Sequence, residues 1–120
     1  MSRRILVEDQ EDNQQILYDL LTKAGYEVAQ AMDGPAALAA VTAQRPDLIL
    51  MDIQLPSLDG YDVTRRLKSD PALRSIPIIV VTSYAMSGDE AKARAAGCDS
   101  YVTKPYNPRQ LLAKVREYLP

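Results

Sequence analysis

The sequence contains no histidine, no tryptophan and no phenylalanine, and Cys98 is its single cysteine. Without histidine, catalysis by serine–histidine or cysteine–histidine pairs is excluded, and a zinc site would lack partners for one thiolate. One cysteine cannot form a disulfide within the chain, and we expect Cys98 to be buried as a small apolar residue. These absences remove three common kinds of functional site from consideration.

The sequence also lacks an excess of one charge and any long apolar run. It carries 14 Lys and Arg residues against 16 Asp and Glu residues, for a net charge of -2. The adjacent cationic pairs, Arg3-Arg4 and Arg65-Arg66, are too short to follow a phosphate backbone, so we expect no nucleic-acid partner. No segment approaches the ~18 apolar residues of a membrane span, and no signal-peptide core follows Met1. We therefore expect a cytoplasmic protein without membrane association.

The length and composition that are present fit one folded domain. The chain has 120 residues, of which 47% are hydrophobic, and this is enough to bury a core. No linker, internal repeat or low-complexity tract divides the sequence. We expect a single domain over residues 1–120, with no output domain.

Five short segments have the pattern of buried β-strands, and helical patterns lie between them. The predicted strands are Arg4–Glu8, Glu27–Ala31, Leu48–Asp52, Ile76–Val81 and Ser100–Thr103. Two of them, Leu48–Asp52 and Ile76–Val81, are almost continuously apolar, which is typical of a parallel sheet covered on both faces. The pattern therefore indicates a sheet with a helix after each strand.

The predicted helices have recognisable beginnings and ends. The first, over residues 12–24, has one apolar stripe at helical spacing and ends at Gly25, where a left-handed terminus favours glycine. That stripe consists of Ile16, Leu17, Leu20, Leu21 and Ala24. A loop over Gln54–Gly60 is expected before the third helix. The other helices are predicted from Pro35 to near Gln44, over residues 61–69, from a capping box at Ser87 to Gly97, and from Asn107 onward.

Five strand–helix repeats with short connections predict an α/β fold. Crossovers between parallel strands are almost always right-handed, and five such units give a doubly wound parallel sheet with helices on both faces. The simplest common strand order is the flavodoxin-like order 2-1-3-4-5. In that order the first strand lies beside the third, so the residues that follow these strands converge at one edge.

Polar residues suited to phosphate chemistry follow four of the strands. They are Glu8 and Asp9, Asp52, Thr82, and Lys104. The carboxyl edge of an open α/β sheet is where ligands bind. Three carboxylates repel one another unless a cation lies among them, and Mg²⁺ typically uses one or two carboxylates plus waters. We expect Asp9 and Asp52 to bind Mg²⁺ directly and Glu8 to hold a metal-bound water.

These residues can together receive a phosphoryl group. A carboxylate such as that of Asp52 can attack phosphorus to form an acyl phosphate. The transferring group spreads negative charge over its oxygens, which Mg²⁺, the ammonium of Lys104 and the hydroxyl of Thr82 would neutralise or bind. A strong base for rapid hydrolysis is missing, so the phosphorylated product should outlast an enzyme intermediate.

Other functions on the same fold fit less well. The alternative is a small metal-dependent phosphohydrolase with an aspartyl-phosphate intermediate, but such enzymes usually place a second aspartate where this chain has Gln54. A nucleotide-binding module would need a glycine-rich loop after the first strand, where Glu8–Asp12 would repel phosphates. A phosphate-independent interaction domain would not need the acid pair, the acceptor, the hydroxyl and the lysine together.

The ordered set of motifs resembles the receiver domain of two-component response regulators over essentially the whole chain. The motifs are Glu8-Asp9, Met51-Asp52-Ile53-Gln54-Leu55-Pro56 with Asp59-Gly60, Val81-Thr82, and Lys104-Pro105. The stretch from Ala85 to Glu90, with Gly97-Cys98, is similar to the stand-alone, DivK-like branch. Each motif alone is weak, but the set in this order is highly specific.

The resemblance implies a role for each matching residue. Asp52 would be the phosphoacceptor, Lys104 the phosphate-binding lysine and Thr82 the switch hydroxyl. Glu8 and Asp9 would form the acid pair, and the backbone carbonyl of Gln54 would complete the metal ligands. Tyr101, three residues before the lysine, would be the rotating aromatic of the switch.

The resemblance also implies partners and a mode of action. A histidine kinase or a phosphotransfer protein would donate the phosphoryl group. The chain would act as a signalling switch that catalyses only its own phosphorylation and slow dephosphorylation, not as an enzyme. We expect it to bind a downstream protein through a face that includes Tyr84, Met86, Tyr101 and Tyr106.

Overall fold

A computed structural model of the chain describes residues 3–8, 11–32, 34–53, 59–82, 89–103 and 107–120. These residues form a 5-stranded parallel sheet in the order β2-β1-β3-β4-β5. The strands are β1 (Arg4–Glu8), β2 (Glu27–Ala31), β3 (Leu48–Ile53), β4 (Ile78–Thr82) and β5 (Ser100–Thr103). The predicted doubly wound sheet and its strand order are therefore confirmed.

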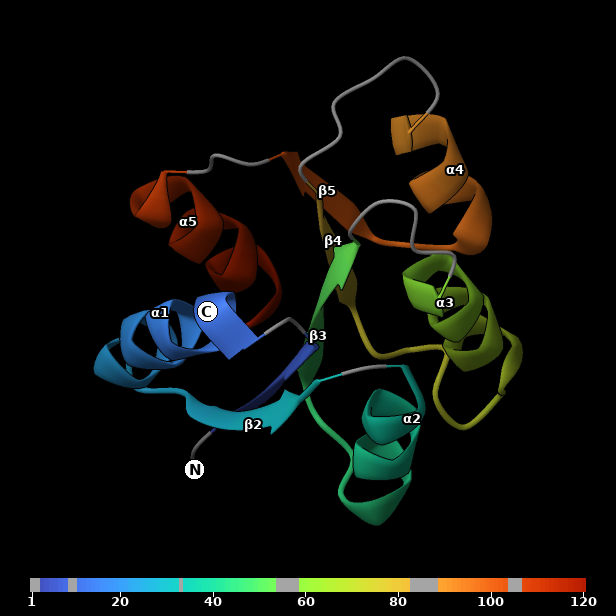
Figure 1. Cartoon of the computed structure of the whole chain (residues 1–120), viewed down its shortest axis with the longest axis horizontal. Helices are drawn as coiled ribbons and strands as arrows, with labels where there is room; N and C mark the ends of the chain where they lie inside the picture. Colours follow the sequence, from blue (N-terminus) through green and yellow to red (C-terminus); the bar gives the residue numbers. More distant parts are fainter. Residues whose placement is uncertain (1–2, 9–10, 33, 54–58, 83–88, 104–106) are drawn as a thin grey trace.

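Helices cover both faces of this sheet, as predicted (Figure 1). They are α1 (Glu11–Lys23), α2 (Gly34–Ala43), α3 (Asp59–Ser69), α4 (Asp89–Ala96) and α5 (Pro108–Tyr118). Helices α1 and α5 lie on one face, and α2, α3 and α4 lie on the other. The structure therefore has three layers, and both edges of the sheet are formed by short strands, β2 and β5.

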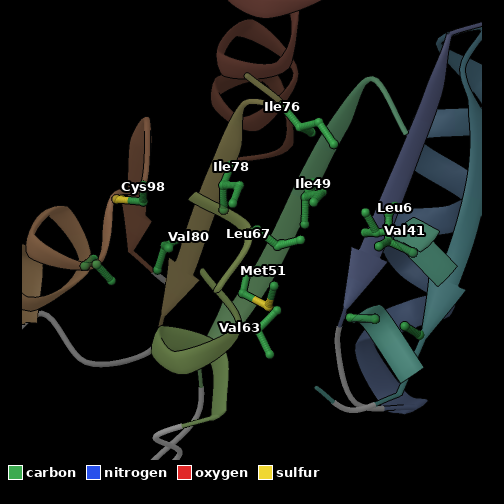
Figure 2. Close-up of a cluster of buried hydrophobic side chains, with 14 residues drawn as sticks. Leu6, Val41, Ile49, Met51, Val63, Leu67, Ile76, Ile78, Val80 and Cys98 are labelled. Carbon is green, nitrogen blue, oxygen red and sulfur yellow. The ribbon is translucent and has the colours of Figure 1, made fainter. Parts of the chain in front are cut away.

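The continuous apolar strands divide their side chains between two cores because successive residues of a strand point to opposite faces. In β3, Leu48 and Leu50 pack with α1 and α5, whereas Ile49 and Met51 pack with α2, α3 and α4. Figure 2 shows the second core, in which side chains of β3 and β4 meet those of α3. Cys98 belongs to this core and is buried, as predicted.

Two predicted element boundaries, the beginnings of β4 and α3, lie two residues from those of the structure, and several others differ by one residue. Strand β4 begins at Ile78 instead of Ile76, because the Ile76 amide donates to the Leu73 carbonyl in a turn and Pro77 has no amide to donate. Helix α3 begins at Asp59, inside the predicted loop Gln54–Gly60. An acidic residue in the first turn of a helix is favoured by the helix dipole, which accounts for this earlier start.

The apolar stripe predicted for α1 was correct in its centre and wrong at one residue. Leu17 and Leu21 are buried, and Leu20 is half-buried against the same core, but Ile16 is 61% exposed. Each residue turns a helix by about 100°, so Ile16 points away from the direction that Leu17 and Leu21 share. Helical spacing alone made the stripe too wide.

After two of the helices, the chain contains a glycine in a backbone conformation that other residues rarely adopt. Gly25 follows α1 with φ +98°, and Gly97 follows α4 with φ +106°. The predicted left-handed end at Gly25 is therefore confirmed. At Gly97 space is limiting as well, because an added Cβ would lie 2.9 Å from Cγ of Lys68.

Candidate functional site

The register of the sheet brings the predicted site residues to one edge. Glu8, the last residue of β1, pairs with Met51, which directly precedes Asp52 in β3. Across the other side of β3, Asp52 pairs with Val81, and Ile53 pairs with Thr82 at the end of β4. Neighbouring strands lie about 4.8 Å apart. The backbones of Glu8, Asp52 and Thr82 therefore lie on three adjacent strands, with Glu8 and Thr82 each one residue from the level of Asp52.

Strand β5 ends at the same edge. Thr103, its last residue, pairs with Thr82, so the chain leaves β5 toward Lys104 beside the end of β4. The parallel arrangement thus directs four chain segments of the predicted site to one side of the molecule. This is the carboxyl edge, where open α/β sheets bind their ligands.

Glu8 is the member of the predicted acid pair that the structure describes with its side chain. It is half-buried, and its oxygen Oε2 is buried. A carboxylate withdrawn from water is stabilised by a nearby cation. The side chain of Glu8, at the end of β1, is therefore suited to an oxygen-coordinated cation, directly or through a water.

Several predicted site residues lie outside the described residues. They are Asp9, Gln54, Tyr84, Met86, Lys104 and Tyr106. For Asp52 and Thr82 the structure describes the backbone, which is placed in β3 and β4 as predicted. Their roles in binding phosphate and metal stay predictions at this point.

Tyr101, the predicted switch aromatic, lies in the middle of β5 beside Val80. It is half-buried and packs at the margin of the core that faces α2, α3 and α4. It also lines a groove of about 410 Å³ between β5 and α5. Tyr101 therefore has contacts with the interior and with a surface groove, as a residue linking the two would need.

The groove adds residues of α5 that the sequence analysis did not single out. From β5 it is lined by Tyr101, Val102 and Thr103, and from α5 by Gln110, Ala113, Lys114 and Glu117. The α5 residues recur at helical spacing beside the buried stripe of Leu111 and Val115. That flanking stripe was visible in the sequence, but only the packing of α5 against the sheet shows that it borders a groove.

The fold and the site define the class of protein. The family model for the response regulator receiver domain matches residues 5–116. The chain therefore belongs to the response regulator receiver domain family, the class of the phosphoaccepting domains of two-component signalling.

Two groups of known proteins are similar to this chain. It is 44% identical over 115 residues to the polar-differentiation response regulators DivK of Brucella anthropi and Brucella ovis, covering 96% of this chain and 94% of theirs. A putative response regulator of Chloroflexus aurantiacus has a TM-score of 0.91 at 30% identity, covering 99% of this chain and 98% of that one. The predicted resemblance to DivK is confirmed.

A third relative bears on the metal. The receiver domain of a sensor histidine kinase from Pseudomonas aeruginosa has a TM-score of 0.88 and 35% identity, with 99% of this chain and 98% of that chain covered. Its structure holds a magnesium ion in the active-site cleft.

The family assignment gives no support to the phosphohydrolase alternative. Within the described ranges, no helix has the length and apolar character of a membrane span.

Proposed function

We propose that this receiver domain accepts a phosphoryl group on Asp52 from a histidine kinase or a phosphotransfer protein, and signals by a changed affinity for another protein. The observation that carries the proposal is the register of β1, β3 and β4. It places Asp52 on the central strand, between the strand that ends in Glu8 and the strand that ends in Thr82. In a member of the receiver family, this is the position of the acceptor carboxylate.

The residues at this edge fit a magnesium ion. The proposed ligands are the carboxylates of Asp9 and Asp52 and the backbone carbonyl of Gln54, with Glu8 acting through a water. These donors are all oxygens, which Mg²⁺ prefers, and Glu8 contributes a half-buried carboxylate on the neighbouring strand. When bound, Mg²⁺ would neutralise charge on the acceptor and on the incoming phosphoryl group.

In the proposed reaction, a carboxylate oxygen of Asp52 forms a bond to phosphorus while the bond between phosphorus and the donor breaks. The product is an acyl phosphate on Asp52, and the electron pair of the broken bond stays with the donor. Lys104 would bind a phosphate oxygen as a point charge, and Thr82 would donate its hydroxyl to another. The chain supplies positioning and neutralisation, as phosphoryl transfer requires.

The proposed output couples Thr82 to Tyr101. If the Thr82 hydroxyl moves toward the phosphate, Tyr101 can move inward from its half-buried position on the adjacent strand. The surface that changes is proposed to include Tyr84, Met86, Tyr101 and Tyr106. We further propose that residues 1–120 act in the cytoplasm as a single-domain switch and not as an enzyme, without nucleic acid or membrane as partners.

Phosphorylation with a small-molecule phosphodonor and Mg²⁺ tests the proposal. We expect one phosphoryl group per chain by intact mass, which disappears in Asp52→Asn and persists in Asp62→Asn. Asp62 is a suitable control because its carboxylate is exposed on α3 and pairs with Arg66 at 3.0 Å. Labelling of Asp52→Asn at the wild-type level would show that the acceptor is another residue.

A further inference from the structure

A second cluster of polar groups lies at the opposite, amino-terminal edge of the sheet and centres on Asp99. The Asp99 amide donates to the carbonyl of Ile78 at 2.8 Å, and the Ile78 amide donates to Oδ2 of Asp99 at 2.8 Å. Ile78 is the first residue of β4, and Asp99 directly precedes β5. This pair of hydrogen bonds therefore holds the beginning of β5 against the beginning of β4.

Lys68, near the end of α3, binds the same carboxylate. Its Nζ lies 2.7 Å from Asp99 Oδ2, 3.0 Å from the carbonyl of Arg74 and 2.8 Å from the carbonyl of Ile76. An ammonium has three hydrogens to donate, so these acceptors can engage all of them. The Lys68 side chain is only 16% exposed, and its stem passes beside Gly97, where a Cβ would meet it.

Tyr118 of α5 completes the cluster. Its hydroxyl donates to the carbonyl oxygen of Asp99 at 3.0 Å. Burial raises the pKa of Tyr118, and the negative charge of Asp99 adds to this, so the hydroxyl keeps its proton well beyond neutral pH. Asp99 thus connects α3, β4 and α5 to the first residue of β5.

Strand β5 needs such a connection more than the other strands do. It has four residues, the fewest of the described strands, and lies at the edge of the sheet, paired with β4 alone. The groove between β5 and α5 begins two residues after Asp99, at Tyr101. Tyr118 is the last residue of α5, and Asp99 directly precedes β5. The hydrogen bond between them therefore connects α5 and β5, the two elements that line the groove, at the beginning of β5.

We propose that Asp99 is a positioning residue that, with Lys68 and Tyr118, fixes the beginning of β5. A displacement at the carboxyl end of β5 is then passed to the groove. This inference rests on the proposed function. A short edge strand that is free at its beginning can shift as a whole, and a displacement at Thr82 or Tyr101 is then absorbed. A strand fixed at its beginning changes at its other end, where Val102 and Thr103 line the groove.

A purely structural role for Asp99 leads to a different expectation. A partly exposed ion pair and its hydrogen bonds would then contribute stability, and their loss would lower the melting temperature without altering how the groove responds. The response of the groove to occupancy of the phosphoryl site is therefore the measurement that separates the two roles.

The experiment uses backbone NMR of the whole chain, with Mg²⁺ and beryllofluoride as the probe of the phosphoryl site. The amide of Thr82 reports occupancy, and the amides of Val102, Thr103 and Ala113 report the groove. Asp99→Asn removes the charge, Tyr118→Phe removes one hydroxyl, and Asp62→Asn is the control, since it removes an exposed charge on α3 that pairs with Arg66. Spectra of each variant with and without the probe are compared with the wild type.

We expect the Thr82 shift change to be preserved in all variants. The groove shift changes should fall by about twofold or more in Asp99→Asn and Tyr118→Phe, in the range by which mutations along coupling networks act, and stay unchanged in Asp62→Asn. Groove shift changes as large as those of the wild type in both Tyr118→Phe and Asp99→Asn would overturn this inference and leave the proposed function standing. If Asp99→Asn does not fold, Tyr118→Phe decides the question. A wild type without any response at Thr82 would overturn the proposed function and this inference with it.

Discussion

Glu8 and Asp9 are proposed to hold Mg²⁺ in different ways. Asp9 is the proposed direct ligand, whereas Glu8 is half-buried and proposed to act through a water. We expect Asp9→Ala to reduce the rise of melting temperature with Mg²⁺ more than Glu8→Ala does. At a Mg²⁺ concentration of 100 times its Kd, the wild type gains about 2.7 kcal/mol. A larger loss for Glu8→Ala would reverse the two assignments, and an unshifted wild type would contradict the metal site.

Tyr118 gives a prediction about pH. Burial and the charge of Asp99 raise its pKa above the ordinary value of 10.0. Because the neutral hydroxyl is favoured in the folded protein, its stabilising effect is fully present below pH 10 and is lost as pH rises through the raised pKa. Tyr118→Phe should cost about 1 kcal/mol of unfolding free energy at pH 7. Urea denaturation of both proteins should show this difference shrinking above pH 10, and a constant difference would be inconsistent with the hydrogen bond to Asp99.

The convergence of the Glu8, Asp52 and Thr82 backbones at one edge of the sheet could be predicted because chain order and strand direction determine it. Glu8, Asp52 and Thr82 each follow or end an apolar strand, so a parallel sheet in the order 2-1-3-4-5 must bring them together. The cluster around Asp99 could not be predicted in this way. Lys68 and Asp99 are 31 residues apart, and their contact depends on where the stem of Lys68 lies, next to Gly97.

Two glycines that follow helices, Gly25 after α1 and Gly97 after α4, can be compared directly. Gly25 and Gly97 both have positive φ, but an added Cβ meets nothing within 4 Å at Gly25 and meets Lys68 at Gly97. Gly25→Ala should therefore cost only the left-handed backbone penalty of about 1–2 kcal/mol. Gly97→Ala should cost more, because Lys68 must move and its hydrogen bonds, worth about 1.5–3 kcal/mol for a charged donor, weaken.

Urea denaturation of the two alanine variants measures this difference directly. The backbone penalty is common to both, so the excess for Gly97→Ala isolates the contact with Lys68. Adding Lys68→Met provides the control, since in that background the excess should shrink. Equal costs for the two glycines would mean that Lys68 relocates without loss.

The elements themselves show where sequence patterns stop being informative. Strands β1, β2 and β5 have the predicted bounds because turns and polar residues delimit them. Ile76 was assigned to β4 because it is apolar, yet it is buried as part of a turn. Ile16 matched the helical spacing of α1 but points to solvent. Hydrophobicity indicates burial well, but the partner of each backbone amide decides whether a residue is in a strand.

For the whole molecule, the proposed switch predicts that acceptance of phosphate and the change of surface can be separated. Thr82→Ala should still be phosphorylated on Asp52, because the attacking carboxylate and the metal ligands are intact. The response of the groove should fall, since a phosphoryl group shifts a conformational equilibrium only through contacts that differ between the two states.

Phosphorylation by mass spectrometry and the NMR shift changes of Val102 and Ala113 test this prediction on the same sample. Thr103→Ala is a useful control, because it removes a hydroxyl from the neighbouring strand at the same level of the sheet. A full groove response in Thr82→Ala would show that the hydroxyl does not couple phosphate to the surface.

The order of the strands also determines how the sheet can grow during synthesis. β3 adds beside β1, β4 beside β3 and β5 beside β4, so each strand made after β2 finds its partner already present. The face under α1 is completed last, because Leu111 and Val115 of α5 pack with Leu17 and Leu21. During synthesis the amino-terminal part of a chain emerges before the rest. A nascent chain that lacks α5 would therefore expose the part of this core that Leu111 and Val115 cover, until the final helix packs there.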